Sequence, residues 1–76
     1  IRLDPGYARA YYNRGFSHRK TGNYDAAIND FTEAIRLDPG YAEAYHNRGA
    51  THEQKGNRTE ADLDYQRAEV LGYYGS

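Results

Sequence analysis

The chain has no cysteine among its 76 residues, and it has no excess of positive charge. Without cysteine there is no disulfide framework and no thiolate metal site, and the composition fits a reducing compartment, with the cytoplasm favoured. Ten Lys and Arg residues against eleven Asp and Glu residues give a formal net charge of −1. A nucleic-acid module normally carries a basic stripe or a high pI, so the charge argues against a nucleic-acid partner.

Long apolar runs are also missing. No stretch approaches the about 18 apolar residues that indicate a transmembrane helix, and no charged-then-apolar leader is present, so we expect neither membrane insertion nor a signal peptide. Hydrophobic residues make up 38% of the chain, below the usual about 45–50%, a figure that also counts Gly. A chain of this size buries about 60% of its unfolded surface, which predicts one small domain of marginal stability.

What the sequence does contain is a near-identical repeat. Residues 1–15 read IRLDPGYARAYYNRG and residues 35–49 read IRLDPGYAEAYHNRG, an offset of 34 residues. An internal period of about 20–50 residues is typical of repeat architectures, in which each unit buries its apolar face on its neighbour. Because the chain opens on Ile-Arg-Leu, the residues that close a unit, we expect it to be a segment of a longer protein. The two copies differ at only two paired positions, Arg9/Glu43 and Tyr12/His46.

The spacing of apolar residues predicts four helices, at residues 8–21, 25–37 and 42–55 and from the second Gly-Asn break to about residue 71. An Asp-Pro-Gly-Tyr turn is expected before the first and third helices. Gly22 suits a left-handed C′ position, and Asn23 is expected to cap the second helix. Asn57 with Glu60 is interpreted as a loose capping box. Short connections make neighbouring helices antiparallel, so the predicted fold is all-α, with two helical hairpins.

These features resemble the tetratricopeptide repeat, a 34-residue helix–turn–helix unit with an aromatic, Gly, Ala, aromatic, Ala and Pro at set places. The resemblance implies an α-solenoid in one domain. Its parts are the end of a preceding repeat with its turn (1–7), repeat one (8–41), repeat two (42–72) and a tail (73–76). The matching residues are Tyr11, Gly15, Ala27, Phe31, Ala34 and Pro39, followed by Tyr45, Gly49, Ala61, Tyr65 and Ala68.

Two pairs of residues depart from the family pattern. Arg14 and Arg48 stand where the family usually has Leu, and His18 and His52 stand where it often has Tyr. We interpret the histidines as packed, hydrogen-bonded side chains rather than ligands. For the arginines two interpretations stay open: a snorkelling side chain with its head in water, or an ion pair with a carboxylate of the next helix. The carboxylates in question recur at the same offset, Asp30 and Asp64.

The fourth helix is predicted to be a polar C-terminal cap. It carries charges where the second helix has apolar or aromatic residues, and charges are not buried cheaply. It also gains an apolar pair, Leu63 and Val70. We expect Tyr73 and Tyr74 to fold back onto that pair, the alternative being that the pair marks a self-association surface. At the other end the first helix is uncovered, so homo-oligomerisation through it is a possibility. The exchanged residues are Tyr24/Arg58, Ile28/Asp62 and Ile35/Glu69.

No set of residues supports catalysis. Ser17 has no His/Asp pattern around it, and neither an H-E-x-x-H motif nor a phosphate-binding loop occurs. His46 and His52 are roughly opposite each other on a helix, so they do not share a metal. Asn57-Arg58-Thr59 fits a glycosylation acceptor, but that triplet is common. We therefore expect no enzyme activity, no cofactor and no metal.

The resemblance implies that one face of the first and third helices lines a concave groove for a peptide or a partner helix. Tyr12 and Phe16 are typical of interface anchors, and Asn13 and Asn47 suit gripping a peptide backbone. Three cations on the first helix and two anions on the third favour a ligand with an acidic and a basic part. The candidate residues are Arg9, Tyr12, Asn13, Phe16, Lys20, Glu43, His46, Asn47 and Ala50, with Arg19, Glu53 and Gln54 on the same face.

The leading hypothesis is a non-enzymatic protein–protein interaction module. The alternatives are a structural spacer or self-association scaffold, and a regulatory segment of a larger enzyme. The family's clamp for acidic C-termini of heat-shock chaperones needs Lys and Asn around Tyr12 and Phe16. Only Asn13 and Asn47 resemble its residues, so that partner is not predicted.

Overall fold

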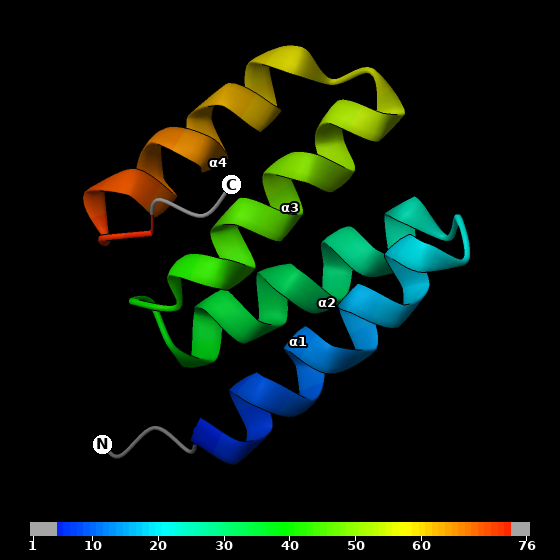
Figure 1. Cartoon of the computed structure of the whole chain (residues 1–76). Helices are drawn as coiled ribbons and strands as arrows, with labels where there is room; N and C mark the ends of the chain where they lie inside the picture. The colour runs from blue at the N-terminus through cyan, green and yellow to red at the C-terminus, as the bar shows by residue number, and fades with distance from the viewer. Residues whose placement is uncertain (1–4, 74–76) are drawn as a thin grey trace.

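The computed structural model describes residues 5–73, and four helices occupy most of that range (Figure 1). They are α1 (Pro5–Lys20), α2 (Tyr24–Leu37), α3 (Ala42–Lys55) and α4 (Arg58–Val70). Residues 5 to 73 contain no strand. The predicted all-α class is therefore confirmed. None of these four helices is long and apolar enough to cross a membrane.

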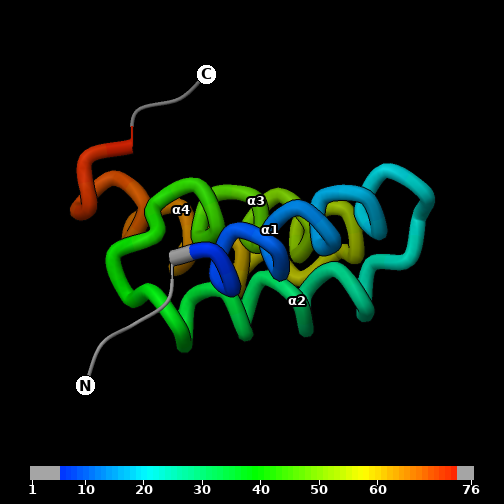
Figure 2. The backbone as a smooth tube through the Cα atoms, turned by 90° about the horizontal axis from the view of Figure 1, so that it is seen from below, coloured from blue at the N-terminus to red at the C-terminus, as the bar shows by residue number. Residues whose placement is uncertain are grey.

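The helices form two hairpins that lie side by side (Figure 1). α1 packs against α2 and α3 against α4, and α2 also packs on α3, so each helix touches its neighbour in the sequence. α1 and α3 make a smaller contact of their own, and Figure 2 shows them in one layer with α2 in the other. The first helix of each hairpin is thereby placed on the same side of the molecule.

The core consists of small residues around one large ring. Phe31 is 0% exposed and lies between α2 and α1. A methyl group added at Gly15 would lie 3.0 Å from the Phe31 ring, and one added at Gly49 would lie 3.1 Å from the carbonyl oxygen of Ala61. Glycine at these two positions lets the two helices of each hairpin approach closely. The buried apolar residues are Ala8, Ala27, Phe31, Ala34, Ala44, Ala61 and Ala68.

The two Asp-Pro-Gly-Tyr segments fold differently. α1 already begins at Pro5, so the turn expected up to Tyr7 is wrong for the described residues, and Asp4 lies outside them. Proline is favoured in the first turn of a helix, where its missing N–H costs no hydrogen bond. In the second copy the turn forms: the Tyr41 N–H donates to the Asp38 carbonyl oxygen at 3.0 Å. There the chain must reverse between two helices that pack on each other.

Three helices end in a left-handed glycine. Gly22, Gly56 and Gly72 have φ values of 85°, 90° and 96°. The N–H of the residue after each glycine donates to a carbonyl oxygen of the last helical turn, at 2.8, 2.8 and 2.9 Å, which is the Schellman pattern. Asn23 and Asn57 occupy the N-cap positions of α2 and α4, as expected, but neither makes a side-chain cap hydrogen bond. Their ψ values of 71° and 74° depart from the extended geometry of a usual N-cap.

A bidentate ion pair joins the two helices of each hairpin. Nε and Nη2 of Arg14 both donate to Asp30 at 2.8 Å, and Arg48 makes the same two bonds to Asp64 at 2.8 Å. The two carboxylates are buried, with 5% and 6% of the residue exposed. Of the two interpretations of the arginines, the ion pair is confirmed. His18 is half-buried, and its Nε2 lies 3.8 Å from Asp30 Oδ2.

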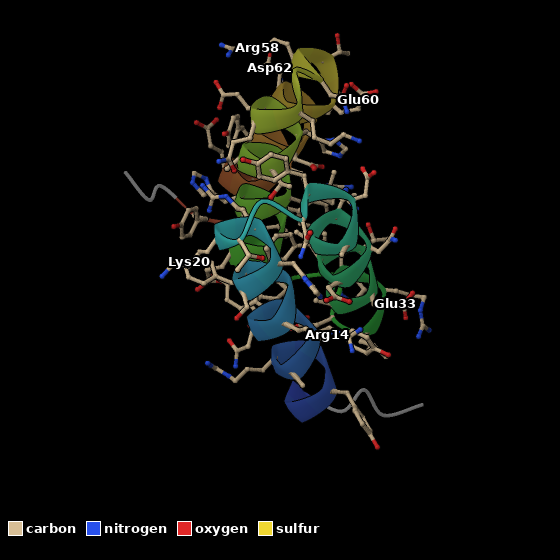
Figure 3. The ribbon with its side chains drawn as sticks, turned by 90° about the vertical axis from the view of Figure 1, so that its right-hand side faces the viewer. Arg14, Lys20, Glu33, Arg58, Glu60 and Asp62 are labelled. Carbon is tan, nitrogen blue, oxygen red and sulfur yellow. The ribbon has the colours of Figure 1, made fainter. Side chains whose placement is uncertain are left out.

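The end of the chain does not cover the apolar pair of α4. Leu63 and Val70 are 60% and 75% exposed, whereas the Tyr73 ring lies 4.7 Å from the His46 ring. The expectation that Tyr73 folds onto the pair is wrong, because the Schellman turn at Gly72 directs it to α3. Tyr74 lies outside the described residues. The N-terminal end of α4 is charged as expected: Figure 3 shows Arg58 near Asp62, with Nε and Oδ1 3.5 Å apart.

Candidate peptide-binding face

The predicted partner-binding residues belong to two helices of different repeats that touch each other. We refer to them as the α1/α3 face. Asn13, Phe16 and Lys20 are exposed, whereas Tyr12 and His46 are half-buried and Asn47 is buried. The α1/α3 face is made of Arg9, Tyr12, Asn13, Phe16, Arg19 and Lys20 of α1 and Glu43, His46, Asn47, Ala50, Glu53 and Gln54 of α3.

A row of rings runs along the α1 side of this face. The Tyr12 ring stacks on Tyr41 at 5.0 Å and on Phe16 at 6.4 Å between centroids. Beneath it lies the buried Phe31 ring, at 5.7 Å. Phe16 remains 39% exposed, and the Lys20 Nζ sits 5.5 Å from its centroid. The outermost ring of the row is thus open to solvent and next to a cation (Figure 3 shows Lys20 pointing away from the end of α1).

Asn47 is not available to a ligand in the way the sequence suggested. It is 7% exposed. Its Nδ2 donates to the Tyr12 hydroxyl at 3.0 Å and to the Glu43 carbonyl oxygen at 3.0 Å, and its Oδ1 accepts from Arg19 Nη1 at 2.9 Å. Asn47 therefore holds other residues of the face in place. Asn13, by contrast, is exposed, and its side chain makes no hydrogen bond within residues 5–73.

Arg19 bonds to two residues of α3, a role that the sequence, which placed Arg19 on this face as one of three cations, did not predict. Besides its bond to Asn47, its Nε donates to Gln54 Oε1 at 2.8 Å. The side chain of Arg19 thereby bridges α1 and α3. The signal for this bridging role is its position about one turn after Phe16, facing the polar residues of the next repeat. No carboxylate of the described residues lies within ion-pair distance of Arg19.

The α1/α3 face carries more unpaired positive charge than the three cations and two anions predicted from the sequence suggest. Of the two carboxylates on its α3 side, Glu53 is already engaged: Arg58 Nη1 lies 2.7 Å from one oxygen and the Tyr65 hydroxyl donates to the other at 2.7 Å. Glu43 keeps an exposed carboxylate. The same face carries three cations, Arg9, Arg19 and Lys20. The expectation of two available anions on α3 is corrected to one.

Two neighbouring rings, His46 of α3 and Tyr65 of α4, have shifted pKa values. Burial, and after it the Arg19 charge, lowers the pKa of His46, so its imidazole is neutral at physiological pH. Burial and the hydrogen bond to Glu53 raise the pKa of Tyr65 to about 12. His46 lies between the Tyr65 and Tyr73 rings, at 5.2 and 4.7 Å. The positive charge of the face therefore comes from its arginines and its lysine.

Two further surfaces adjoin this face. An open depression of about 280 Å³ lies at its edge, lined by Arg9, Asp38, Gly40, Tyr41 and Glu43. On the outer side of α1, Tyr7 is 63% exposed. The equivalents of this outer side in α3 are covered by α2: the side chain of Arg14 is 63% exposed, and that of Arg48 is 21% exposed.

Two stacked helical hairpins, with aromatic and cationic side chains gathered on one face, define a helical-repeat protein. Models of the tetratricopeptide repeat match residues 8–41 and 31–69, and the second match alone covers more than half of the chain. The chain belongs to the tetratricopeptide repeat family. No curated protein sequence matches it significantly.

Solved structures with a similar fold include two crystal structures of MamA and one peptide complex. The MamA chains are 35% identical, with TM-scores of 0.83 and 0.81, and 86% of this chain is covered. The first tetratricopeptide repeat of Spaghetti (RPAP3), bound to the HSP90 peptide SRMEEVD, is 26% identical with a TM-score of 0.91 over 95% of this chain. This chain spans only 36–38% of the MamA chains and 57% of the Spaghetti chain.

Proposed function

We propose that this chain is a non-enzymatic protein-interaction module that binds an extended, acidic peptide along the α1/α3 face. The observation that carries the proposal is the exposed Phe16 ring beside cations that have no ionic partner among the described residues. Aromatic side chains often anchor protein interfaces. Cations without an ionic partner attract and orient an acidic ligand. The family and its peptide-bound neighbour support an interaction role.

The acidic character of the ligand follows from the charges that remain available. Arg9, Arg19 and Lys20 make no ion pair within the described residues, whereas Glu53 is paired with Arg58. The peptide bound by the Spaghetti repeat, SRMEEVD, has three acidic residues and one arginine. That peptide is therefore a suitable probe of this chain, without implying that it is the natural partner.

Replacing Phe16 with alanine is expected to weaken binding of fluorescently labelled SRMEEVD by about 5- to 30-fold, the effect of losing about 1–2 kcal/mol of anchor contact. The measurement is a fluorescence-polarisation titration. Tyr7→Ala is the matched control, because it removes another exposed ring of α1 from the outer side. Equal affinity of the Phe16→Ala and Tyr7→Ala variants would contradict the placement of the ligand.

Self-association through α4 is the second candidate, because Leu63 and Val70 stay exposed. They stand seven positions apart, on one stripe of the helix, and line an open depression of about 220 Å³ with Gln66 and Arg67. An apolar stripe of this kind would suit an isologous contact with a second copy of the chain.

This candidate predicts that the sedimentation coefficient rises with protein concentration. The double variant Leu63→Glu, Val70→Glu places like charges on the stripe and is expected to sediment as a monomer throughout. A coefficient that is already independent of concentration in the unaltered chain would dismiss self-association through α4.

A further inference from the structure

Arg19 is the best-held cation of the α1/α3 face. Its Nε donates to Gln54 Oε1 at 2.8 Å and its Nη1 to Asn47 Oδ1 at 2.9 Å. Both acceptors are neutral amide oxygens, and both belong to α3, the first helix of the next repeat. The guanidinium is therefore fixed in place without being neutralised.

The acceptor at Nη1 is itself fixed. Asn47 is 7% exposed, and its Nδ2 donates to the Tyr12 hydroxyl and to the Glu43 carbonyl oxygen, both at 3.0 Å. This chain of hydrogen bonds runs from the aromatic row of α1 through α3 and back to Arg19. A side chain ordered before binding loses less conformational entropy when a ligand arrives.

The Arg19 guanidinium keeps donors for a further partner. A guanidinium has five N–H donors, and the two bonds to α3 use one on Nε and one on Nη1. Within residues 5–73 the Arg19 Nη2 group makes no hydrogen bond. The Nη1/Nη2 edge of a guanidinium is a fork that matches a carboxylate. The neighbouring carboxylate of α3, Glu53, is held by Arg58 and Tyr65 instead.

The other cations of the face are held differently. Arg9 and Lys20 are exposed and make no ion pair within the described residues, and Lys20 lies over the Phe16 ring. A flexible, hydrated cation gives long-range attraction that salt screens. Of these three cations, only Arg19 combines a fixed orientation with an Nη2 group that makes no hydrogen bond within the described residues.

We propose that Arg19 is a carboxylate-binding residue of the α1/α3 face and that it takes one carboxylate of the bound peptide through Nη1 and Nη2. The proposal rests on the proposed function and deepens it, because it names the group that recognises the ligand and the chemistry recognised. The carboxylate comes from an Asp or Glu side chain or from a peptide C-terminus, and both sources present the same two oxygens.

The test is a polarisation titration with four labelled peptides on the unaltered chain and on variants. SRMEEVD and SRMQQVN, each with a free or an amidated C-terminus, separate side-chain carboxylates from the terminal one. Arg19→Lys keeps the charge and removes the fork, and it is expected to weaken binding about tenfold or more for each peptide that supplies the carboxylate. The carboxylate-free peptide, SRMQQVN amide, is expected to bind both proteins equally.

Two further variants keep the test independent of folding. Gln54→Glu leaves Arg19 in place and sets a carboxylate against its Nε, so it is expected to weaken acidic peptides about as much as Arg19→Lys. Arg36→Lys, an exposed arginine of α2 paired with Glu33, is the matched control and is expected to bind like the unaltered chain. Circular dichroism at 222 nm checks that each variant keeps its helices.

The outcomes separate this proposal from the proposed function. If Arg19→Lys and Gln54→Glu bind every acidic peptide like the unaltered chain while Phe16→Ala weakens them, the face binds peptides and the role of Arg19 is overturned. If the unaltered chain binds none of the four peptides, the proposed function is overturned and the Arg19 proposal with it.

Discussion

Replacing Phe31 with alanine is expected to lower the free energy of unfolding by about 3–5 kcal/mol. Phe31 is 0% exposed and is one of the two largest fully buried side chains. Its ring fills the space that Gly15 leaves on α1 and supports the Tyr12 ring at 5.7 Å. A chain of this length has a total stability of about 4–11 kcal/mol, so the loss is a large part of the whole. Urea denaturation followed by circular dichroism at 222 nm measures it.

The internal repeat supplies the matched control. Tyr65 stands 34 positions after Phe31 and has the same place on α4, but it is half-buried and its hydroxyl donates to Glu53. Tyr65→Ala is therefore expected to lower the free energy of unfolding by less than Phe31→Ala. If the two variants lose the same amount, the core is not centred on the first hairpin as the exposures of the two residues indicate.

The sequence predicts the hairpins well because their packing recurs. Gly15 and Gly49 are small at the same place in each repeat, and both face an aromatic ring and an aspartate of the next helix. Local residue type and long-range packing agree at these positions, so the period alone indicates the fold. The turns show the limit: Pro5–Tyr7 and Pro39–Tyr41 are identical in sequence, yet only the second reverses the chain, because there α2 and α3 pack on each other.

The face was harder to predict than the fold, because its side chains are partnered across repeats. Asn13 and Asn47 occupy equivalent positions, but only Asn47 has α1 beside it, so it is buried and hydrogen-bonded while Asn13 is exposed. The position of Tyr73 depends on the left-handed Gly72, which has no counterpart at the end of α2. The hydrogen-bond partners of Asn47 depend on how α1 and α3 pack together, and the pattern of residue types along the chain does not show that packing.

The second large effect concerns the ion pair of the second hairpin. Arg48→Met is expected to lower the free energy of unfolding by about 3–5 kcal/mol, because it leaves the buried carboxylate of Asp64 without a countercharge. Arg48 donates twice to Asp64 at 2.8 Å and once to Thr32 of α2 at 3.1 Å. The substitution therefore also removes a bond between the two repeats. Urea denaturation of the variant and of the unaltered chain gives the difference.

The equivalent pair of the first hairpin is the internal comparison. The side chain of Arg14 is 63% exposed, against 21% for Arg48, although the two carboxylates are about equally buried. Water reaches the site more easily when Arg14 is removed, and within the described residues Arg14 makes no hydrogen bond to the other repeat that would be lost with it. Arg14→Met is therefore expected to destabilise the chain less than Arg48→Met. The reverse order would mean that burial of the arginine does not determine the effect.

A double variant distinguishes the net contribution of the Arg48–Asp64 pair to stability from the destabilisation caused by removing only one partner. A buried ion pair replaced by apolar residues of similar shape is often neutral in stability, whereas removal of one partner is not. Arg48→Met with Asp64→Leu is therefore expected to regain most of the stability that Arg48→Met alone loses. Additive losses in the double variant would instead show that each side chain stabilises the chain by itself. Recovery would mean that the pair adds little net stability and that the loss in Arg48→Met comes from the unpaired buried carboxylate of Asp64.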